Sequence, residues 1–507
     1  MAIRQCNKIL ITNRSEIALR IQATCKSLGI KTVAIYAPED AQASYVYKAD
    51  ESYPLSLRGF QAYLNQEEIL SIACNAGVDA IHPGYGFLSE SSSFAKKVLA
   101  AGIVWIGPMP DTMLLMGDKA QARALMRMIN VPINQGAEFK AVAFDLNAAK
   151  DCAQALGYPV IIKDSLGGGG KAMRRVDHDI DFDTAWHAVL SEGKRLGFSG
   201  NIIVEKYLPN ARHIEIQIAG DGKNFIHFFE RECSVQRKHQ KIVEEAPCRF
   251  VPQETLDRMY DAAITIAQAV SYVNIGTVEF LVTATGEFYF LEVNARLQVE
   301  HSVTELTTGV DLVALQIHVA FNQKLPMTQQ EVCRRGHAIE CRIYAENPAV
   351  NFMPSVGTVQ YLQVPRGPFV RVDHDLRQGG EITPFFDAMI AKITVQGATR
   401  AQALANMLGA LNDFMLAGCT TNISFLRAII TSDVFIQGDI STHWLLSPDV
   451  VAKLCAGDLT APTIDQEELI VIAAALHEAL AARAIMAVVG DKELHGLSKK
   501  WKQALWK

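Results

Sequence analysis

The chain has 507 residues, too many for one simple hydrophobic core, and this length predicts two to four domains. Charged residues make up 20% of the chain and the net charge is −6, which argues against a nucleic-acid-binding protein. The ten cysteines form no Cys-x-x-Cys pair, so neither a zinc site nor a disulfide framework is expected, and reduced thiols favour a cytoplasmic location.

Residues 1–115 alternate strands with helices. The N-terminus carries no signal-peptide pattern, and no apolar run in the chain is long enough to span a membrane. Buried strands are expected at 8–12, 31–37, 79–82 and 103–107, with helices at 16–28, 66–75 and 92–101. This alternation predicts a Rossmann-like domain, in which helices cover both faces of a parallel sheet and ligands bind at the carboxyl ends of the strands.

A helical linker is expected at 116–138 and a small α+β unit at 139–207. The small unit contains the glycine run Gly167–Gly170, which lies between two expected strands, with Lys163 before it and Lys171 after it. The run fits neither a Walker A loop nor a Rossmann fingerprint, because the required Gly, Ser or Thr and following helix are missing. It predicts a flap whose backbone N–H groups close over phosphates; a flexible surface hairpin is the alternative.

Residues 208–450 are expected to form a mixed, largely antiparallel domain. Within it, residues 291–300 alternate without a break and predict one continuous strand with two different faces. The apolar face would carry Leu291, Val293, Ala295, Leu297 and Val299, and the polar face Glu292, Asn294, Arg296, Gln298 and Glu300. Such alternation alone is typical of one solvated face of an antiparallel sheet.

A second strand, Thr277–Val282, precedes this one and is joined to it by a turn at 284–286. The resulting hairpin would place Glu279 near Glu292. Two carboxylates held close in an apolar frame are costly unless a cation lies between them, and Mg²⁺ prefers oxygen ligands with substrate phosphates. The hairpin therefore predicts a metal–nucleotide site.

Basic residues are concentrated at 229–247, which is either a basic surface loop or an anion site beside the predicted metal strand. A separate tail is expected at 451–507. It contains a predicted amphipathic helix at 464–489 and a basic end with two tryptophans, and either packs on its own domain or docks a partner.

Several long motifs, in this order, resemble biotin carboxylase, an ATP-grasp enzyme. They are NRSEIA at 13–18, HPGYGFLSE at 82–90, MGDK at 116–119, GGGGK at 167–171, RHIEIQ at 212–217, QKIVEEAP at 240–247 and EVNARLQVEH at 292–301. The resemblance runs from the N-terminus to about residue 446, and Lys171 with 351–354 looks most like the biotin carboxylase part of acyl-CoA and pyruvate carboxylase α-subunits. It implies an N-terminal Rossmann-like domain, a small flap domain and a mixed C-terminal domain.

The resemblance also implies a role for each matching residue. ATP would be held by Lys119, Lys163, Gly168, Gly169, Gly170, Lys171, Met173, Glu205, Lys206, Leu208, His213, Gln236, His239 and Leu281. Mg²⁺ or Mn²⁺ would be held by Glu279, Glu292 and Asn294, and bicarbonate and biotin by Lys241, Arg296, Gln298, Val299, Tyr85 and Arg342. Glu300 would be the general base, and Arg342, Lys241 and Arg296 would complete the catalytic set.

The implied reaction is the carboxylation of biotin by ATP and bicarbonate through carboxyphosphate. The sequence contains no Met-Lys-Met biotinylation motif, so biotin is expected in trans on a carrier protein or domain, together with a carboxyltransferase subunit. Members of the family commonly form homodimers. The acceptor, pyruvate or an acyl-CoA, is left open, as are three alternatives: another ATP-grasp ligase, a weakly active or regulatory ATP-binding paralogue, and a structural subunit, which the intact glutamates disfavour.

Four residues depart from the family pattern. Ser15 and Ala172 replace glycines, Ser302 replaces a proline, and Asp164 replaces an alanine beside Lys163. If residue 172 requires a positive φ, its alanine costs about 1 kcal/mol and stiffens the flap. Asp164 is expected to point away from Lys163, so it need not contact the phosphates. These departures are expected to change rates and not to abolish activity.

Overall fold

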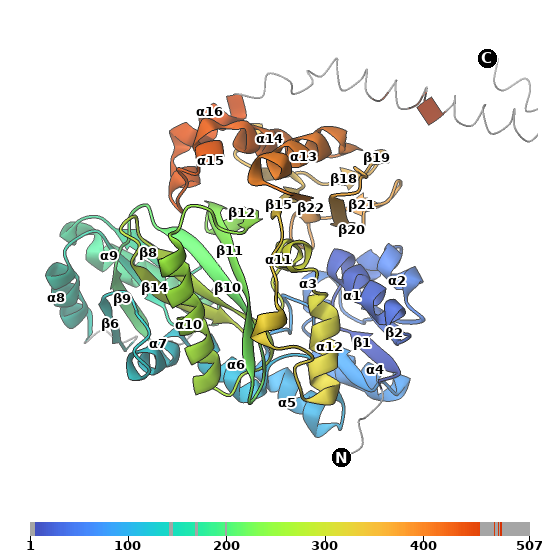
Figure 1. The fold of residues 1–507 in the computed structure, drawn as a ribbon, viewed down its shortest axis with the longest axis horizontal. Coiled ribbons are helices and arrows are strands. Elements are labelled where there is room, and N and C mark those ends of the chain that lie inside the picture. Colours follow the sequence, from blue (N-terminus) through green and yellow to red (C-terminus); the bar gives the residue numbers. More distant parts are fainter. Residues whose placement is uncertain are drawn as a thin grey trace, which may run out of the picture.

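A computed structural model describes residues 6–140, 145–167, 171–197, 200–456, 471, 475, 477 and 478. Figure 1 places the N-terminal domain (blue) on one side of a large central sheet and the small unit (teal) on the other, with the C-terminal helices above. The tail helix expected at 464–489 lies outside the described residues except for four helical positions. Among the described helices, none is long and apolar enough to cross a membrane.

The N-terminal domain is the expected parallel sheet with helices on both faces. Its strands lie in the order β3-β2-β1-β4-β5, and the four expected strands are confirmed as β1, β2, β4 and β5. The strands are β1 (Lys8–Ile11), β2 (Lys31–Tyr36), β3 (Glu51–Pro54), β4 (Ala80–His82) and β5 (Val104–Trp105). The helices are α1 (Ser15–Ser27), α2 (Ser44–Lys48), α3 (Gly59–Ala62), α4 (Gln66–Ala76), α5 (Ser92–Ala100) and α6 (Pro110–Gly117).

The small unit is an antiparallel sheet packed on two helices, and α7 (Lys119–Met128) leads into it. Its elements are β6 (Gly136–Phe139), α8 (Leu146–Leu156), β7 (Val160–Asp164), β8 (Met173–Val176), α9 (Phe182–Arg195) and β9 (Ile202–Lys206), in the strand order β6-β9-β7-β8. The sheet takes in residues 136–138, which the sequence assigned to the linker. Phe182 and Trp186 of α9 are fully buried against Val160 and Ile162 of β7, so an aromatic core holds the unit together.

The central sheet has eight antiparallel strands in the order β14-β13-β10-β11-β12-β15-β22-β20. They are β10 (Arg212–Asp221), β11 (Phe225–Arg237), β12 (Gln240–Ala246), β13 (Val273–Val282), β14 (Phe288–Asn294), β15 (His337–Tyr344), β20 (Val370–His374) and β22 (Met389–Gly397). The expected antiparallel character of 208–450 is thus confirmed, and the basic stretch at 229–247 is largely the β11–β12 hairpin rather than a surface loop.

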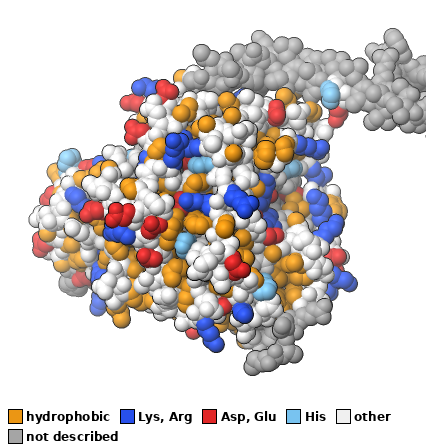
Figure 2. Space-filling view, in the orientation of Figure 1, with side chains coloured by type: hydrophobic (Ala, Val, Ile, Leu, Met, Phe, Trp, Pro, Cys, Tyr) orange, Lys and Arg blue, Asp and Glu red, His pale blue; other side chains and the backbone are white. Residues whose placement is uncertain are grey.

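Helices and short strands cover the central sheet. The helices are α10 (Gln253–Ala269), α11 (His301–Thr308), α12 (Leu312–Asn322), α13 (Arg400–Asp413), α14 (Ile423–Thr431), α15 (Asp433–Gln437) and α16 (Pro448–Ala456). The short strands are β16 (Glu346–Asn347), β17 (Met353–Pro354), β18 (Gly357–Thr358), β19 (Tyr361–Gln363), β21 (Glu381–Ile382) and β23 (Met415–Ala417). Figure 2 shows basic side chains gathered in the band between the C-terminal helices and the central sheet, and acidic ones mainly over the small unit.

The prediction of one continuous strand over 291–300 is wrong. Strand β14 ends at Asn294, and Glu300 immediately precedes helix α11. A β-bulge also interrupts the alternation, because Glu292 lies opposite Glu279 while Phe290 lies opposite Phe280. Leu291 is the extra residue, so it lines a cavity and does not join Val293 in the core.

Both replaced glycines lie at positive φ. Ser15 has φ +57° and Ala172 has φ +51°, the left-handed region that favours glycine. The backbone at Ala172 therefore has the positive φ at which alanine is expected to cost stability and stiffen the flap. The Asp164 carboxylate accepts the backbone N–H of Leu166 at 2.9 Å, and its residue also lines the large cavity described below.

Candidate active site

A cavity of about 920 Å³ lies between the N-terminal domain, the small unit and the central sheet. With one exception, every predicted site residue that the structure describes lines it: Tyr85, Lys119, Lys163, Lys171, Met173, Glu205, Lys206, Leu208, His213, Gln236, His239, Lys241, Glu279, Leu281, Glu292, Asn294, Arg296, Gln298, Val299 and Arg342. The exception is Glu300, which is fully buried just behind Lys241 and Arg342. Gly168, Gly169 and Gly170 lie outside the described residues.

The floor of the cavity is the β13–β14 hairpin. On its hidden face, Val278 lies opposite Val293 and Phe280 opposite Phe290, and all four are buried in one cluster. On its cavity face, Glu279 lies opposite Glu292. The apolar pairs fix the register of the strands, and a shift by one residue would turn the carboxylates into the core.

One ammonium group holds three carboxylates together in the centre of the site. The Nζ of Lys241 lies 2.6 Å from Glu215 Oε2, 2.8 Å from Glu279 Oε1 and 2.8 Å from Glu300 Oε1. Burial alone would lower the pKa of Lys241, but these three carboxylates outweigh it and hold the pKa well above its ordinary value. Lys241 is therefore a permanent cation at neutral pH.

Glu300 is positioned as an ionised carboxylate. Arg342 Nη2 lies 3.0 Å from its Oε2, while Lys241 contacts its other oxygen. Burial would raise the pKa of Glu300, but Lys241 and Arg342 lower it well below its ordinary value. Because both cations line the cavity, a substrate that draws them away would expose Glu300 and strengthen it as a base.

Arg296 and Gln298 form a cluster of hydrogen-bond donors beside these carboxylates. Arg296 donates to Gln298 Oε1 at 2.9 Å and to Asn294 Oδ1 at 2.8 Å, and its Nε donates to Glu90 Oε2 at 2.9 Å. Gln298 Nε2 in turn donates to Glu279 Oε1 at 3.1 Å. A planar guanidinium held in this way suits a planar anion such as bicarbonate.

The residues expected to hold a divalent metal fit that role. Glu279 and Glu292 face each other, and Asn294 lies beside them with its Nδ2 2.8 Å from Glu279 Oε1. Burial would raise the pKa of Glu279, but Lys241 and His213 lower it well below its ordinary value, so the carboxylate is ionised. Glu292 pairs with Lys119 at 3.0 Å. Carboxylate and amide oxygens next to phosphate-binding lysines are the donor set that Mg²⁺ prefers.

The opposite wall of the cavity presents lysines. Lys163 Nζ lies 2.7 Å from Glu205 Oε2, and Lys119 Nζ donates to the carbonyl of Gly167 at 2.5 Å. Lys206 Nζ donates to the carbonyl of Gly157 at 2.7 Å. Each ammonium has three N–H donors, so each retains donors for phosphate oxygens.

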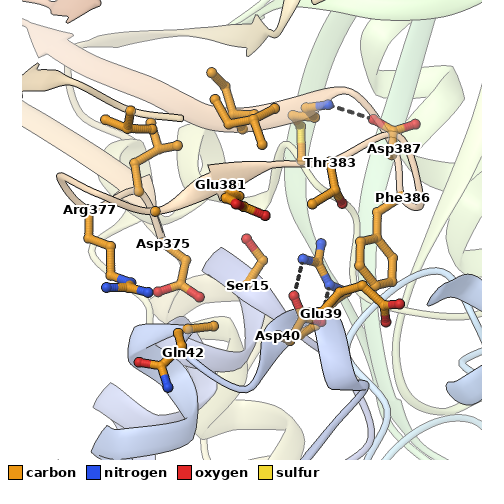
Figure 3. A pocket seen from close by; sticks show the side chains of 18 residues that line it. Ser15, Glu39, Asp40, Gln42, Asp375, Arg377, Glu381, Thr383, Phe386 and Asp387 are labelled. Carbon is orange, nitrogen blue, oxygen red and sulfur yellow. Dashed lines mark hydrogen bonds and ion pairs between the residues drawn. The ribbon is translucent and has the colours of Figure 1, made fainter. Parts of the chain in front are cut away.

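A second cavity, of about 110 Å³, adjoins the first at the amino-terminal end of α1. Figure 3 shows Ser15 pointing into it, between Asp375 and Glu381. The Arg14 guanidinium lies 3.7 Å from the ring centre of Phe386, and both residues line the two cavities. The Ser15 substitution therefore affects a shared wall and not the predicted catalytic residues.

Sequence reasoning missed several partners of the site. Glu215 could have been found, because it follows His213 by two residues on the same strand face, in a motif already noted. Glu90 ends the noted HPGYGFLSE motif and holds Arg296. Glu244, which pairs with Arg342 at 2.5 Å, likewise lies in the noted QKIVEEAP motif. Arg123, whose Nη1 pairs with Glu205, gave no signal because its partner is distant in sequence.

Three family models match the chain in sequence order. They are the biotin carboxylase N-terminal domain over residues 5–113, the carbamoyl-phosphate synthase L chain ATP binding domain over 118–328, and the biotin carboxylase C-terminal domain over 340–447. Biotin carboxylase 2 of Bacillus subtilis is 43% identical over 440 residues, which cover 86% of this chain and 98% of that protein. The mitochondrial methylcrotonoyl-CoA carboxylase subunit alpha of Dictyostelium discoideum is 42% identical over 448 residues, 88% of this chain and 64% of its own length.

A solved structure agrees with these sequence relatives. It is the biotin carboxylase domain dimer of Hydrogenobacter thermophilus 2-oxoglutarate carboxylase, in complex with magnesium ADP, ADP and bicarbonate. It matches with a TM-score of 0.86 and 38% identity, and the match covers 89% of this chain and 99% of that one. The ATP-grasp fold and the resemblance expected from the sequence are both confirmed, and the chain belongs to the biotin carboxylase family.

Proposed function

We propose that this protein is a biotin carboxylase, an ATP-dependent ligase that uses bicarbonate to carboxylate biotin borne on a separate carrier. The observation that carries the proposal is the Lys241 cluster. One cation joins Glu300, the predicted base, to Glu279, a predicted metal ligand, in a cavity whose other wall presents lysines. Activation of bicarbonate by ATP requires a base, cations that stabilise negative charge and groups that bind phosphate, and this cavity brings the three together.

In the first half-reaction, Arg296, Gln298 and Lys241 bind bicarbonate, and Glu300 accepts its proton. The oxyanion attacks the γ-phosphorus of ATP, which forms carboxyphosphate and releases ADP. Lys119 and Lys163 neutralise the charge on the phosphate oxygens. Mg²⁺ held by Glu279, Glu292 and Asn294 would supply further charge neutralisation and phosphate orientation when bound.

In the second half-reaction, carboxyphosphate breaks down to CO₂ and phosphate. Phosphate removes the N1 proton of biotin, while Arg342 donates to the ureido oxygen, which gains negative charge. The biotin nitrogen then attacks CO₂. Tyr85, Phe87 and Phe60 line the same cavity from the N-terminal domain, and Phe60 is 47% exposed, so we place the arriving biotin arm against this aromatic side.

Water must be kept from carboxyphosphate during this sequence. The glycine run after Lys163 joins two antiparallel strands, β7 and β8, as a phosphate-covering flap requires. Closure of its backbone N–H groups over the phosphates stays a prediction, because residues 168–170 lie outside those described.

The proposed partners are a biotinyl carrier, a carboxyltransferase subunit and a second copy of this chain. The match covers only 64% of the methylcrotonoyl-CoA carboxylase subunit, so the activity of a whole carboxylase, with pyruvate or an acyl-CoA as acceptor, belongs to this proposal. The cysteines are scattered along the chain and none forms a Cys-x-x-Cys pair, which supports a cytoplasmic location.

The test is ATP cleavage by the purified, folded chain with bicarbonate, magnesium and free biotin. We expect ADP production to depend on bicarbonate and to rise when biotin is added, with label from bicarbonate appearing in carboxybiotin. Tight ATP binding without cleavage would instead identify a regulatory paralogue. Cleavage stimulated by an amino acid or peptide but not by biotin would identify a different ATP-grasp ligase.

A further inference from the structure

The strands beneath the Glu300 segment carry two matched pairs of polar residues. On β15 and β22, Arg342 lies directly opposite Lys392, and Glu340 lies directly opposite Thr394. Directly opposite residues, and residues two apart on one strand, point to the same face of a sheet. This face lies under residues 299–302, because Arg342 reaches Glu300 and Lys392 reaches Val299.

Lys392 holds the backbone immediately before Glu300. It is fully buried, and its Nζ donates a hydrogen bond to the carbonyl of Val299. Its Nζ also lies 3.6 Å from Glu340 Oε2 and 3.8 Å from Asp373 Oδ2. A buried ammonium is costly unless it is paired and hydrogen-bonded, so the Val299 carbonyl is held by a strong, directional donor.

Glu340 holds the backbone just after Glu300 through a side chain. The Oγ of Ser302, in the first turn of α11, donates to Glu340 Oε2, and Thr394 Oγ1 donates to the same oxygen at 3.1 Å. Ser302 is fully buried. The proline that the family pattern places at this position could not donate this bond, so the contact is specific to the serine version of the segment.

We propose that Lys392, acting with Glu340 and Ser302, is a positioning residue for Glu300. It fixes the carbonyl on one side of the base while the Ser302–Glu340 bond fixes the helix on the other. Lys392, Glu340 and Ser302 thereby fix where the Glu300 carboxylate lies relative to Lys241 and bicarbonate, although they contact no substrate themselves. This inference rests on the proposed function, since it concerns the base of that reaction.

The first test is Lys392→Met, with Lys392→Arg as the conservative variant. Misplacement of a reacting group by about 1 Å costs on the order of 100-fold. We expect kcat for bicarbonate-dependent ATP cleavage to fall about 10- to 100-fold in Lys392→Met and the KM for bicarbonate to rise. The KM for ATP should change less than about twofold, because no ATP-binding lysine is altered. Lys392→Arg, which can still donate to the Val299 carbonyl, should recover part of the loss.

Ser302→Ala should shift the same parameters in the same direction, by a smaller factor. The matched control is Arg400→Met, which breaks another buried ion pair, with Glu245 at 2.7 Å, and does not contact residues 299–302. After correction for the folded fraction, Arg400→Met should leave both KM values and kcat unchanged.

A second readout does not depend on activity. Hydrogen exchange of a peptide spanning 296–306 should be faster in Lys392→Met than in the unaltered chain, and unchanged in Arg400→Met. If this peptide exchanges at the same rate in Lys392→Met as in Arg400→Met, the positioning role is wrong, whatever the activity. If exchange responds as expected but the unaltered chain cleaves no ATP with bicarbonate, the positioning role stands and the proposed function fails.

Discussion

The two walls of the large cavity hold their charges in opposite ways. On the central sheet, Lys241 contacts three carboxylates and Arg342 contacts two, so the charges are neutralised by one another. On the small unit, Lys163 has a single carboxylate partner, Glu205, and Lys206 donates only to backbone carbonyls within the described contacts. The charges of the first wall therefore have partners without a substrate, whereas the lysines of the second wall gain their remaining partners only when phosphate binds.

This difference separates chemistry from binding. Removing a charge from the central sheet leaves its partners buried and unpaired, which alters both the fold and the reaction. Removing a lysine from the small unit takes away a contact that matters mainly to the nucleotide. Substitutions on each wall, and others outside both, measure how far this separation holds.

The largest effect is expected for Glu300→Gln on the central sheet. Loss of a general base lowers rates about 10²- to 10⁴-fold, so bicarbonate-dependent ATP cleavage should fall by this factor. ATP affinity, measured by equilibrium binding, should be unchanged because the opposite wall is intact. A change of less than about tenfold in the cleavage rate would contradict the assignment of Glu300 as the base.

Arg231→Met should cause the largest loss of stability. Arg231 is fully buried and contacts Glu215 at 2.5 Å, Gln217 at 2.7 Å and Thr277 at 3.0 Å. Breaking a buried ion pair costs about 3–5 kcal/mol, so the free energy of unfolding in denaturant should fall by this amount. A loss below about 1 kcal/mol would show that this wall does not depend on its internal pairs.

Lys163→Met tests the other wall. Glu205 keeps its ion pair with Arg123, so the free energy of unfolding should fall by no more than about 1–2 kcal/mol. A charge-assisted hydrogen bond to phosphate is worth about 1.5–3 kcal/mol, so the KM for ATP should rise roughly 10- to 100-fold. The KM for bicarbonate should be unaffected. An equal rise in both would erase the proposed distinction between the walls.

Glu16→Gln should change the pH dependence of stability. Burial raises the pKa of Glu16 to about 8, while Lys392 opposes this and Asp373 and Glu340 add to it. The folded chain thus holds a proton that the unfolded chain releases, and this contribution is lost as pH rises from about 4.5 to about 8. Relative to Glu16→Gln, the unaltered chain should lose up to about 1.4 kcal/mol per pH unit in this range. Parallel curves of unfolding free energy against pH would contradict it.

The smallest effect is expected outside both walls. Ser15 has φ +57°, which costs a non-glycine residue about 1–2 kcal/mol, partly offset by the greater freedom of glycine when unfolded. Ser15→Gly should therefore stabilise the chain by about 0.5–1 kcal/mol. Ser15→Ala keeps the strain and should give no gain. Ala172→Gly should gain less than Ser15→Gly, because it also removes a fully buried methyl group.

The sequence predicted most of the site because the residues lie in local patterns. The Glu279–Glu292 pairing followed from two strands and a short turn, and the structure has that register. The βα alternation likewise predicted the parallel N-terminal sheet. Both depend on neighbours in sequence, whose geometry is set by the period of a strand or a helix.

The errors arise where tertiary contacts decide. Perfect alternation at 291–300 suggested one strand, but a bulge at Leu291 and the start of α11 after Glu300 give two changes of direction that the pattern does not record. Lys392 gave no signal, because its partner Val299 is 93 residues away. Such long-range partners become visible only when the sheet order is known.

The bulge at Leu291 separates the hairpin into two halves that can vary independently. Between the turn and the bulge, Phe288 and Phe290 only have to fill a core, so exchanges of similar volume there should be tolerated. Beyond the bulge, Glu292 and Asn294 face the cavity because Leu291 is accommodated as an extra residue; in a regular strand that kept Leu291, Glu292 would share the face of Phe290. A bulge-free pairing that kept Leu291 would therefore turn the predicted metal ligands toward the core, whereas deletion of Leu291 alone, with every charged residue retained, would leave Glu292 opposite Glu279 and facing the cavity.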